Sequence, residues 1–119
     1  MEINKNKTTN QIKDEFASMF PHLKLEFFKK KHSENEGNKK KQMIEENLSL
    51  SSLIENQNEG FFIIASDMTV SSVEQSFENN FGLHVQIYRK SGDLWLQTTA
   101  TDSWTLEKQS LYAEQNTTV

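Results

Sequence analysis

The chain has 119 residues, a formal net charge of −4, no cysteine and 34% hydrophobic residues. This length suits one compact domain or two half-size units that share a core. The lack of cysteine excludes disulfide bonds, thiolate metal ligands and a thiol nucleophile. The N-terminal segment carries no apolar signal-peptide region, and no window approaches the roughly 18 apolar residues of a membrane span. We therefore expect a cytoplasmic protein that does not cross a membrane.

Two parts of the sequence show the same order of apolar residues around a helix-stopping residue. At an offset of 61 residues, Ile3 aligns with Ile64, Thr8 with Thr69, Ile12 with Val73, Phe16 with Phe77 and Phe20 with Phe81. At an offset of 60, Leu23, Leu25, Phe27, Phe28 and Lys29 align with Leu83, Val85, Ile87, Tyr88 and Arg89. We interpret this as an internal duplication, with a first repeat at 1–58 and a second at 59–119 that share one core. Chance similarity between two amphipathic segments is the alternative.

The first repeat begins with a strongly marked helix. Thr8 stands at an N-cap position with Gln11 three residues later, which is the spacing of a capping box, and Pro21 ends the helix. The elements expected after this stop are a strand, a long loop at 30–40, a return strand near 42–46, and a helix in which Ser52 and Glu55 have a capping-box spacing.

The second repeat predicts the same elements with shorter connections. The apolar run 61–66 is typical of a strand, and Thr69 then takes an N-cap position. The helix that follows shows one apolar stripe, and Gly82 stops it. The segment 83–88 then alternates strictly between apolar residues and the set His84, Gln86 and Tyr88, which predicts a strand with one buried face.

A two-residue turn at Ser91 and Gly92 is expected to close a hairpin, because Gly tolerates a positive φ angle. This turn would place Ile87 opposite Leu96 on the core face, which is also expected to carry Leu94, and Tyr88 opposite Trp95 on the other face. The remaining expected pairs are Lys90 with Asp93, Arg89 with Leu94, and Val85 with Thr98. A final helix is expected near 102–109, capped by Asp102 or Ser103, with Trp104 and Leu106 facing inward. The predicted fold is α+β: a tandem strand–helix–strand–strand–helix repeat, with antiparallel hairpins and helices packed on one sheet face.

The sequence shows no pattern that indicates a catalytic, cofactor or metal site. His22, His32 and His84 lie beside a helix stop, in a charged loop and on a strand, so none forms a ligand pair on a helix. There is no G-x-S-x-G elbow and no glycine-rich phosphate loop. The polar stretch 98–105 could bind a ligand in a cleft between the repeats, but capping of the last helix is the favoured interpretation. We therefore expect a protein that is not an enzyme.

The aromatic residues on the polar side of the predicted hairpin are the main candidates for function. Alternation places Phe28, Tyr88 and Trp95 on the face that the helices leave uncovered, together with Gln86 and Gln97. Exposed apolar patches of this kind are often contact surfaces. The leading hypothesis is binding of a protein partner or self-association, with a homodimer expected. The alternative is that the two repeats pack face to face and bury these side chains.

Binding of single-stranded nucleic acid is the second hypothesis. The order of elements resembles part of an RRM-like sheet, in which exposed aromatic residues stack on bases. Residues 29–41 contain six lysines and two glutamates, but polar residues rather than aromatic ones separate them. This composition and the acidic net charge favour a solvated loop over a nucleic-acid site.

The C-terminal half carries a recognisable signature in the stretch FGLHVQIYRKSGDLWLQTTATDSWTLEKQ. It resembles a group of small uncharacterised bacterial proteins of the Bacteroidetes type, which share an FGL strand, an R-x-S-G turn and a T-D-x-W-T-L-E-x-Q ending. The likeness covers about the last 50 residues. It implies a cytoplasmic bacterial protein and no particular chemistry.

Overall fold

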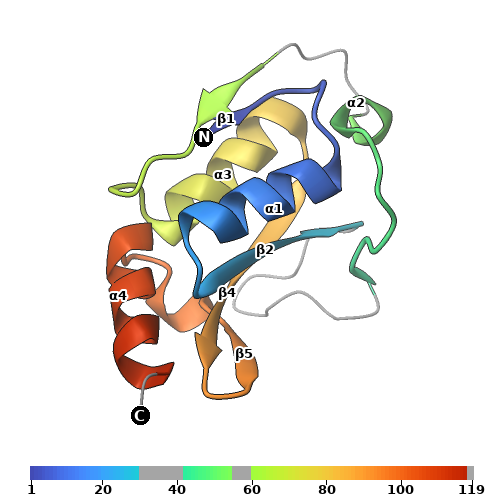
Figure 1. Ribbon diagram of the computed structural model, residues 1–119. Coiled ribbons are helices and arrows are strands. Elements are labelled where there is room, and N and C mark those ends of the chain that lie inside the picture. The colour runs from blue at the N-terminus through green and yellow to red at the C-terminus, as the bar shows by residue number, and fades with distance from the viewer. Residues whose placement is uncertain (30–41, 55–59, 118–119) are drawn as a thin grey trace.

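The computed structural model describes residues 1–29, 42–54 and 60–117 and confirms the predicted α+β class (Figure 1). Its elements, in chain order, are β1 (Glu2–Ile3), α1 (Thr9–Met19), β2 (Leu23–Phe28), α2 (Leu50–Leu53), β3 (Phe62–Ile63), α3 (Val70–Phe81), β4 (His84–Ser91), β5 (Leu94–Gln97), the 3₁₀ helix η2 (Thr99–Thr101) and α4 (Leu106–Thr117). Helices α1 and α3 lie side by side over the sheet that contains β2 and β4, and α4 lies at one end of it (Figure 1).

The strands form two antiparallel sheets, and each sheet combines strands from both halves of the chain. One contains β1 and β3, and the other has the order β2–β4–β5. In the larger sheet Glu26 of β2 lies directly opposite Gln86 of β4. These two residues occupy equivalent positions at the offset of 60, so the two halves meet around this pair. The halves therefore join edge to edge and not face to face.

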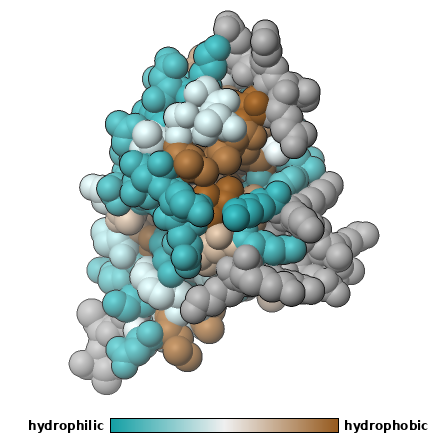
Figure 2. Space-filling model, turned by 90° about the vertical axis from the view of Figure 1, so that its right-hand side faces the viewer, coloured by the Kyte–Doolittle hydropathy of each residue, from teal (hydrophilic) through white to brown (hydrophobic). Residues whose placement is uncertain are grey.

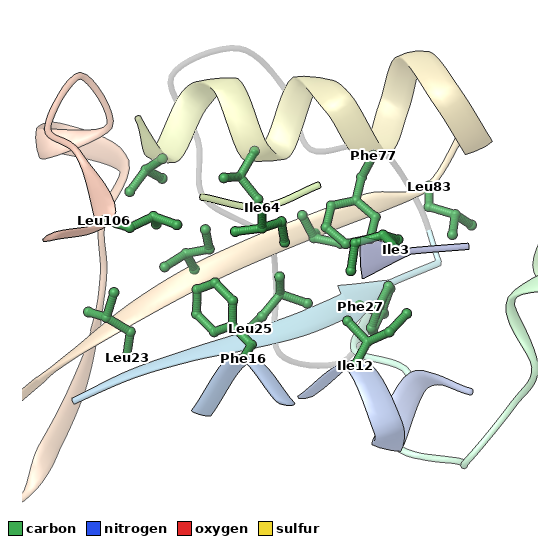
Figure 3. Packing of buried hydrophobic residues seen from close by; sticks show 14 of the residues in the cluster. Ile3, Ile12, Phe16, Leu23, Leu25, Phe27, Ile64, Phe77, Leu83 and Leu106 are labelled. Atoms are coloured by element: carbon green, nitrogen blue, oxygen red, sulfur yellow. The ribbon is translucent and has the colours of Figure 1, made fainter. Parts of the chain in front are cut away.

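A single hydrophobic cluster fills the space between the helices and the larger sheet (Figure 3). Phe16 of α1, Leu25 and Phe27 of β2, and Phe77 of α3 all point into it and are almost completely buried. The Phe27 and Phe77 rings meet edge to face with centroids 5.6 Å apart, a favoured geometry for aromatic pairs. The core thus depends on side chains from both halves.

Local signals for the first helix of each half are confirmed. The Thr8 hydroxyl accepts a hydrogen bond from the Gln11 N–H and the Gln11 side chain accepts one from the Thr8 N–H, which completes the capping box. The Thr69 hydroxyl accepts a hydrogen bond from the Ser72 N–H in the same way. Gly82 ends α3 in the left-handed conformation with φ +66°.

The two halves also form the same long-range backbone hydrogen bonds at equivalent positions. In the first half the bonds are Thr9 N–H to Leu48 O, Leu50 N–H to Lys7 O and Ser51 N–H to Lys5 O, and in the second they are Val70 N–H to Trp104 O, Leu106 N–H to Met68 O and Glu107 N–H to Ser66 O. This agreement supports an internal duplication. The proposed boundary between residues 58 and 59 lies within the segment 55–59, which is outside the described residues, so the division into repeats stays a prediction.

Several predicted element boundaries are wrong. The strand expected at 61–66 is only Phe62–Ile63, and α2 begins at Leu50 and not at Ser52. The return strand expected near 42–46 is reduced to one bridge between Phe28 and Met43, flanked by two backbone hydrogen bonds. The loop 30–40 with His32, and Glu55 of the expected capping box, lie outside the described residues.

The predicted hairpin register is shifted by two residues. Gly92, with φ +60°, and Asp93 form the turn, so Arg89 lies opposite Leu96 and Lys90 lies opposite Trp95. A left-handed glycine at the first turn position suits the primed hairpin turns, whose twist matches that of the strands. A shift of two preserves the side-chain alternation, so Tyr88 and Trp95 still share one face, although they are not opposite each other.

Candidate protein-contact surface

Strand β5 exposes three consecutive large apolar side chains. Leu94, Trp95 and Leu96 are 65%, 38% and 41% exposed, and we call these three residues the β5 surface. In the described part of the chain, β5 pairs with β4 on one side and with no strand on the other. The surface therefore combines apolar side chains with a sheet edge.

The position of β5 in the sheet explains this exposure. Helices α3 and α4 pack on β4, and α1 packs on β2, whereas β5 packs chiefly against β4. Leu94 and Leu96 project from the face that carries the core residue Ile87, but no core is built beneath them, contrary to the prediction that they face inward. Hydrophobic atoms reach the surface at the lower end of the molecule, where Figure 1 places the β4–β5 hairpin (Figure 2).

Trp95 lies on the opposite face, in contact with basic residues. The Lys24 Nζ atom is 4.9 Å from the centre of a Trp95 ring and 5.3 Å from that of Tyr88, and the Lys90 Nζ atom is 5.9 Å from Trp95. Ammonium groups at these distances are attracted to the ring faces. The two lysines thus lie against the indole while a large part of Trp95 stays exposed.

Tyr88 connects this group to the interior of the sheet. Burial raises the pKa of its phenol above the usual value, the nearby Glu26 carboxylate raises the pKa further, and a hydrogen bond from the Gln97 side chain lowers it. The phenol therefore stays neutral at physiological pH. Tyr88 contributes little exposed area, because only 8% of it is accessible.

The five residues predicted to bind a partner do not form one exposed patch. Phe28, Gln86 and Tyr88 are buried, so the expectation that they are exposed is wrong, whereas Trp95 and Gln97 are exposed. Whether any of them contacts a partner stays a prediction. Leu94 and Leu96, which the sequence predicts to face the core, are also accessible. Alternation gives no signal for their exposure, because it puts Leu94 and Leu96 on the face that carries Ile87.

The polar segment 98–105, which follows β5, forms hydrogen bonds within the chain. The Thr98 hydroxyl and N–H both donate to the Ile87 carbonyl, at 2.7 and 3.2 Å. The buried Gln109 side chain donates to the carbonyl and hydroxyl oxygens of Thr101, both at 2.8 Å. This confirms a local structural role for the segment. The predicted cap residues Asp102 and Ser103 are wrong, since the Thr105 hydroxyl accepts the capping bond from the Lys108 N–H.

Glu74 of α3 is the most perturbed acid in the described residues. Burial raises the pKa of its carboxyl to about 7, a hydrogen bond from the Ile87 backbone lowers it, and the nearby Asp102 charge raises it. Its Oε2 atom is buried without a hydrogen-bond partner in the structure. This arrangement is unfavourable for the charged form and makes Glu74 a source of pH-dependent stability.

The other large exposed apolar residues lie on other elements: Met19 on α1, Phe61 and Ile63 at β3, and Leu111 and Tyr112 on α4, with Met19 and Leu111 lining one pocket between their helices. Among residues 1–29, 42–54 and 60–117, no three His, Asp or Glu side chains are grouped so that they could hold a metal ion. Within the same ranges, every helix is too short or too polar to cross a membrane. The β5 surface differs from these residues in having three consecutive exposed apolar side chains on one strand.

Comparison with known proteins gives no match to a family model, to a curated protein or to a solved structure.

Proposed function

We propose that the chain is a non-enzymatic protein-interaction module that contacts its partner through β5. The observation that carries this proposal is the run of three exposed apolar residues on a strand edge. Natural edge strands are protected by charges, proline or bulges, because an open edge offers hydrogen-bonding groups to other chains. No charged residue or proline occurs from Leu94 to Gln97. A partner strand added here would cover side chains on both faces of β5.

The mode of binding that this edge supports is addition of a strand from the partner. Main-chain hydrogen bonds would supply affinity, and the side chains of the β5 surface would supply specificity. Trp95 suits a central position, because tryptophan contributes strongly to interface energy and its ring lies between the other two residues of the β5 surface.

The proposal is tested by Leu96→Lys, which puts a charge on the β5 surface without altering its backbone. We expect Leu96→Lys to weaken any assembly of the purified chain, or binding of a copurifying protein, by about tenfold or more, because a buried unpaired charge is costly in an interface. Sedimentation velocity and quantitative affinity capture would measure the two effects.

Ile63→Lys is the matched control, since Ile63 is 59% exposed and lies on a strand of the smaller sheet. This variant should keep the assembly and binding of the wild type. Identical behaviour of the wild type and Leu96→Lys, with both folded by circular dichroism, would show that β5 is not the contact element.

A further inference from the structure

We propose, building on the function proposed above, that the partner of β5 is β5 of a second copy, paired antiparallel with Trp95 of one copy opposite Trp95 of the other. The two three-stranded sheets would then join into one sheet across a two-fold axis. The open edge of β5 would thus bind a second copy of the chain in a single register.

The sequence of β5 is complementary to itself. Residues 93–97 read Asp-Leu-Trp-Leu-Gln, so the apolar residues are arranged symmetrically about Trp95. In a two-fold interface each contact occurs twice, with residue i against j and j against i. The proposed register puts Leu94 opposite Leu96 of the second copy, and the reverse, with the two Trp95 residues between these pairs.

The faces of the sheet agree with this register. Side chains directly opposite each other in an antiparallel pair lie on the same face of the sheet. Leu94 and Leu96 share one face of β5 and Trp95 lies on the other, so leucines meet leucines and tryptophan meets tryptophan. A shift of two residues in one direction would put Trp95 against Gln97. A shift in the other direction would put Trp95 against Asp93, so both shifts lose apolar contacts.

The backbone of β5 presents the required groups to the open edge. The Thr98 N–H donates to the Ile87 carbonyl, so Thr98 points its backbone groups toward β4. Lys90, which lies opposite Trp95, donates its N–H to the His22 carbonyl on the β2 side of the sheet. Because these directions alternate along antiparallel strands, the N–H and C=O of Trp95 point away from β4. Two Trp95 residues opposite each other could therefore exchange a pair of backbone hydrogen bonds.

The charges along the edge are compatible with self-pairing. Asp93 is the ionisable residue within 93–97, and the register puts it opposite Gln97 of the second copy. Like charges directly opposite each other, which would be destabilising, are thereby avoided.

Single cysteines test the register, since the chain contains no cysteine of its own. The experiment mixes Leu94→Cys chains with Leu96→Cys chains under mild oxidation and follows covalent dimer on non-reducing gels. These two positions would form a pair that is not hydrogen-bonded, with Cα atoms about 4.5 Å apart, which a disulfide can span. Two Leu96→Cys residues would be about 8 Å apart, beyond that reach. The mixture should therefore form covalent dimer about tenfold faster than either variant alone.

Faster linkage in Leu96→Cys alone than in the mixture would overturn the register. A wild-type chain that sediments as a monomer at high micromolar concentration would overturn self-pairing. The proposed function can hold even where self-pairing fails. If the chain is a monomer, and its bound protein is lost with Leu96→Lys and kept with Ile63→Lys, then β5 is still the contact strand. The second copy is then excluded as its partner.

Discussion

The guanidinium of Arg89 donates a hydrogen bond to the Gln109 Oε1 atom at 2.7 Å, and this bond joins β4 to α4. The same guanidinium lies 4.6 Å from the centre of the Tyr112 ring and 5.5 Å from that of Trp104. Gln109 is fully buried and its amide also binds Thr101. These contacts fix the last helix and the segment after β5 to the sheet, next to the proposed contact strand.

Gln109→Leu should reduce the free energy of unfolding by about 2–3 kcal/mol, because Arg89 and the Thr101 carbonyl would each lose a partner in a partly buried place. Urea unfolding followed by circular dichroism would measure the change. Gln115→Leu makes the same replacement at an exposed position of α4 and should change stability by about 0.5 kcal/mol at most. Equal effects of the two replacements would show that the Arg89–Gln109 contact does not stabilise the helix.

Glu74 should make the protein less stable as the pH rises through neutrality. The pKa of its carboxyl is about 7 in the folded chain, whereas the ordinary value, which represents the unfolded chain, is 4.5. The folded chain therefore holds the proton more tightly. The stability that the protonated Glu74 carboxyl contributes is fully present below pH 4.5 and is lost as the pH rises through about 7. Relative to the wild type, Glu74→Gln should therefore gain about 2 kcal/mol of stability between pH 5 and pH 8.

Urea unfolding at those two pH values tests this expectation. Glu45→Gln is the control, because Glu45 is exposed and its replacement should leave the pH dependence of the wild type unchanged. A pH dependence in Glu74→Gln equal to that of the wild type would assign the effect to another group.

Gly82→Ala should destabilise the chain by about 1 kcal/mol through backbone strain alone. Gly82 has φ +66°, and an added Cβ would meet no atom within 4 Å, so no steric clash contributes. Gly82→Asn should cost less, since asparagine tolerates the left-handed conformation better than alanine. Thermal unfolding would compare the two variants, and a larger loss for asparagine than for alanine would contradict this explanation.

The two N-caps offer a test of the equivalence between the halves. Thr8→Ala and Thr69→Ala should each cost about 1 kcal/mol, because each leaves an N–H in the first turn of a helix without its side-chain acceptor. Gln11→Ala should cost more than Ser72→Ala, since the Gln11 side chain also accepts a hydrogen bond from the Thr8 N–H, whereas Ser72 makes no such reciprocal bond at the described Thr69 cap. Chemical denaturation of the four variants would measure these differences, and unequal costs at the two threonines would show that the caps are not equivalent.

Features that depend on neighbouring residues follow directly from the sequence. The caps at Thr8 and Thr69, the helix stop at Gly82 and the buried side of β4 follow from short-range geometry and from side-chain periodicity. The sequence does not fix the position of the hairpin turn, because a turn at Ser91–Gly92 and a turn at Gly92–Asp93 both contain the glycine. The two resulting registers differ by two residues, so each side chain stays on the same face of the sheet. The sequence could not separate these two registers by the direction of the side chains.

Burial at the candidate site depended on contacts between distant segments. Leu94 and Leu96 have the alternation of core residues, yet β5 lies at the edge of the sheet and beyond the helices, so they are exposed. Phe28 and Gln86 were expected on an open face and are buried. Periodicity assigns a side chain to one face of a strand, but only the packing of other elements on that face decides whether water reaches it. The local order of helices and strands was therefore readable from the chain, whereas the exposed strand edge emerged only from the way the two halves pack together.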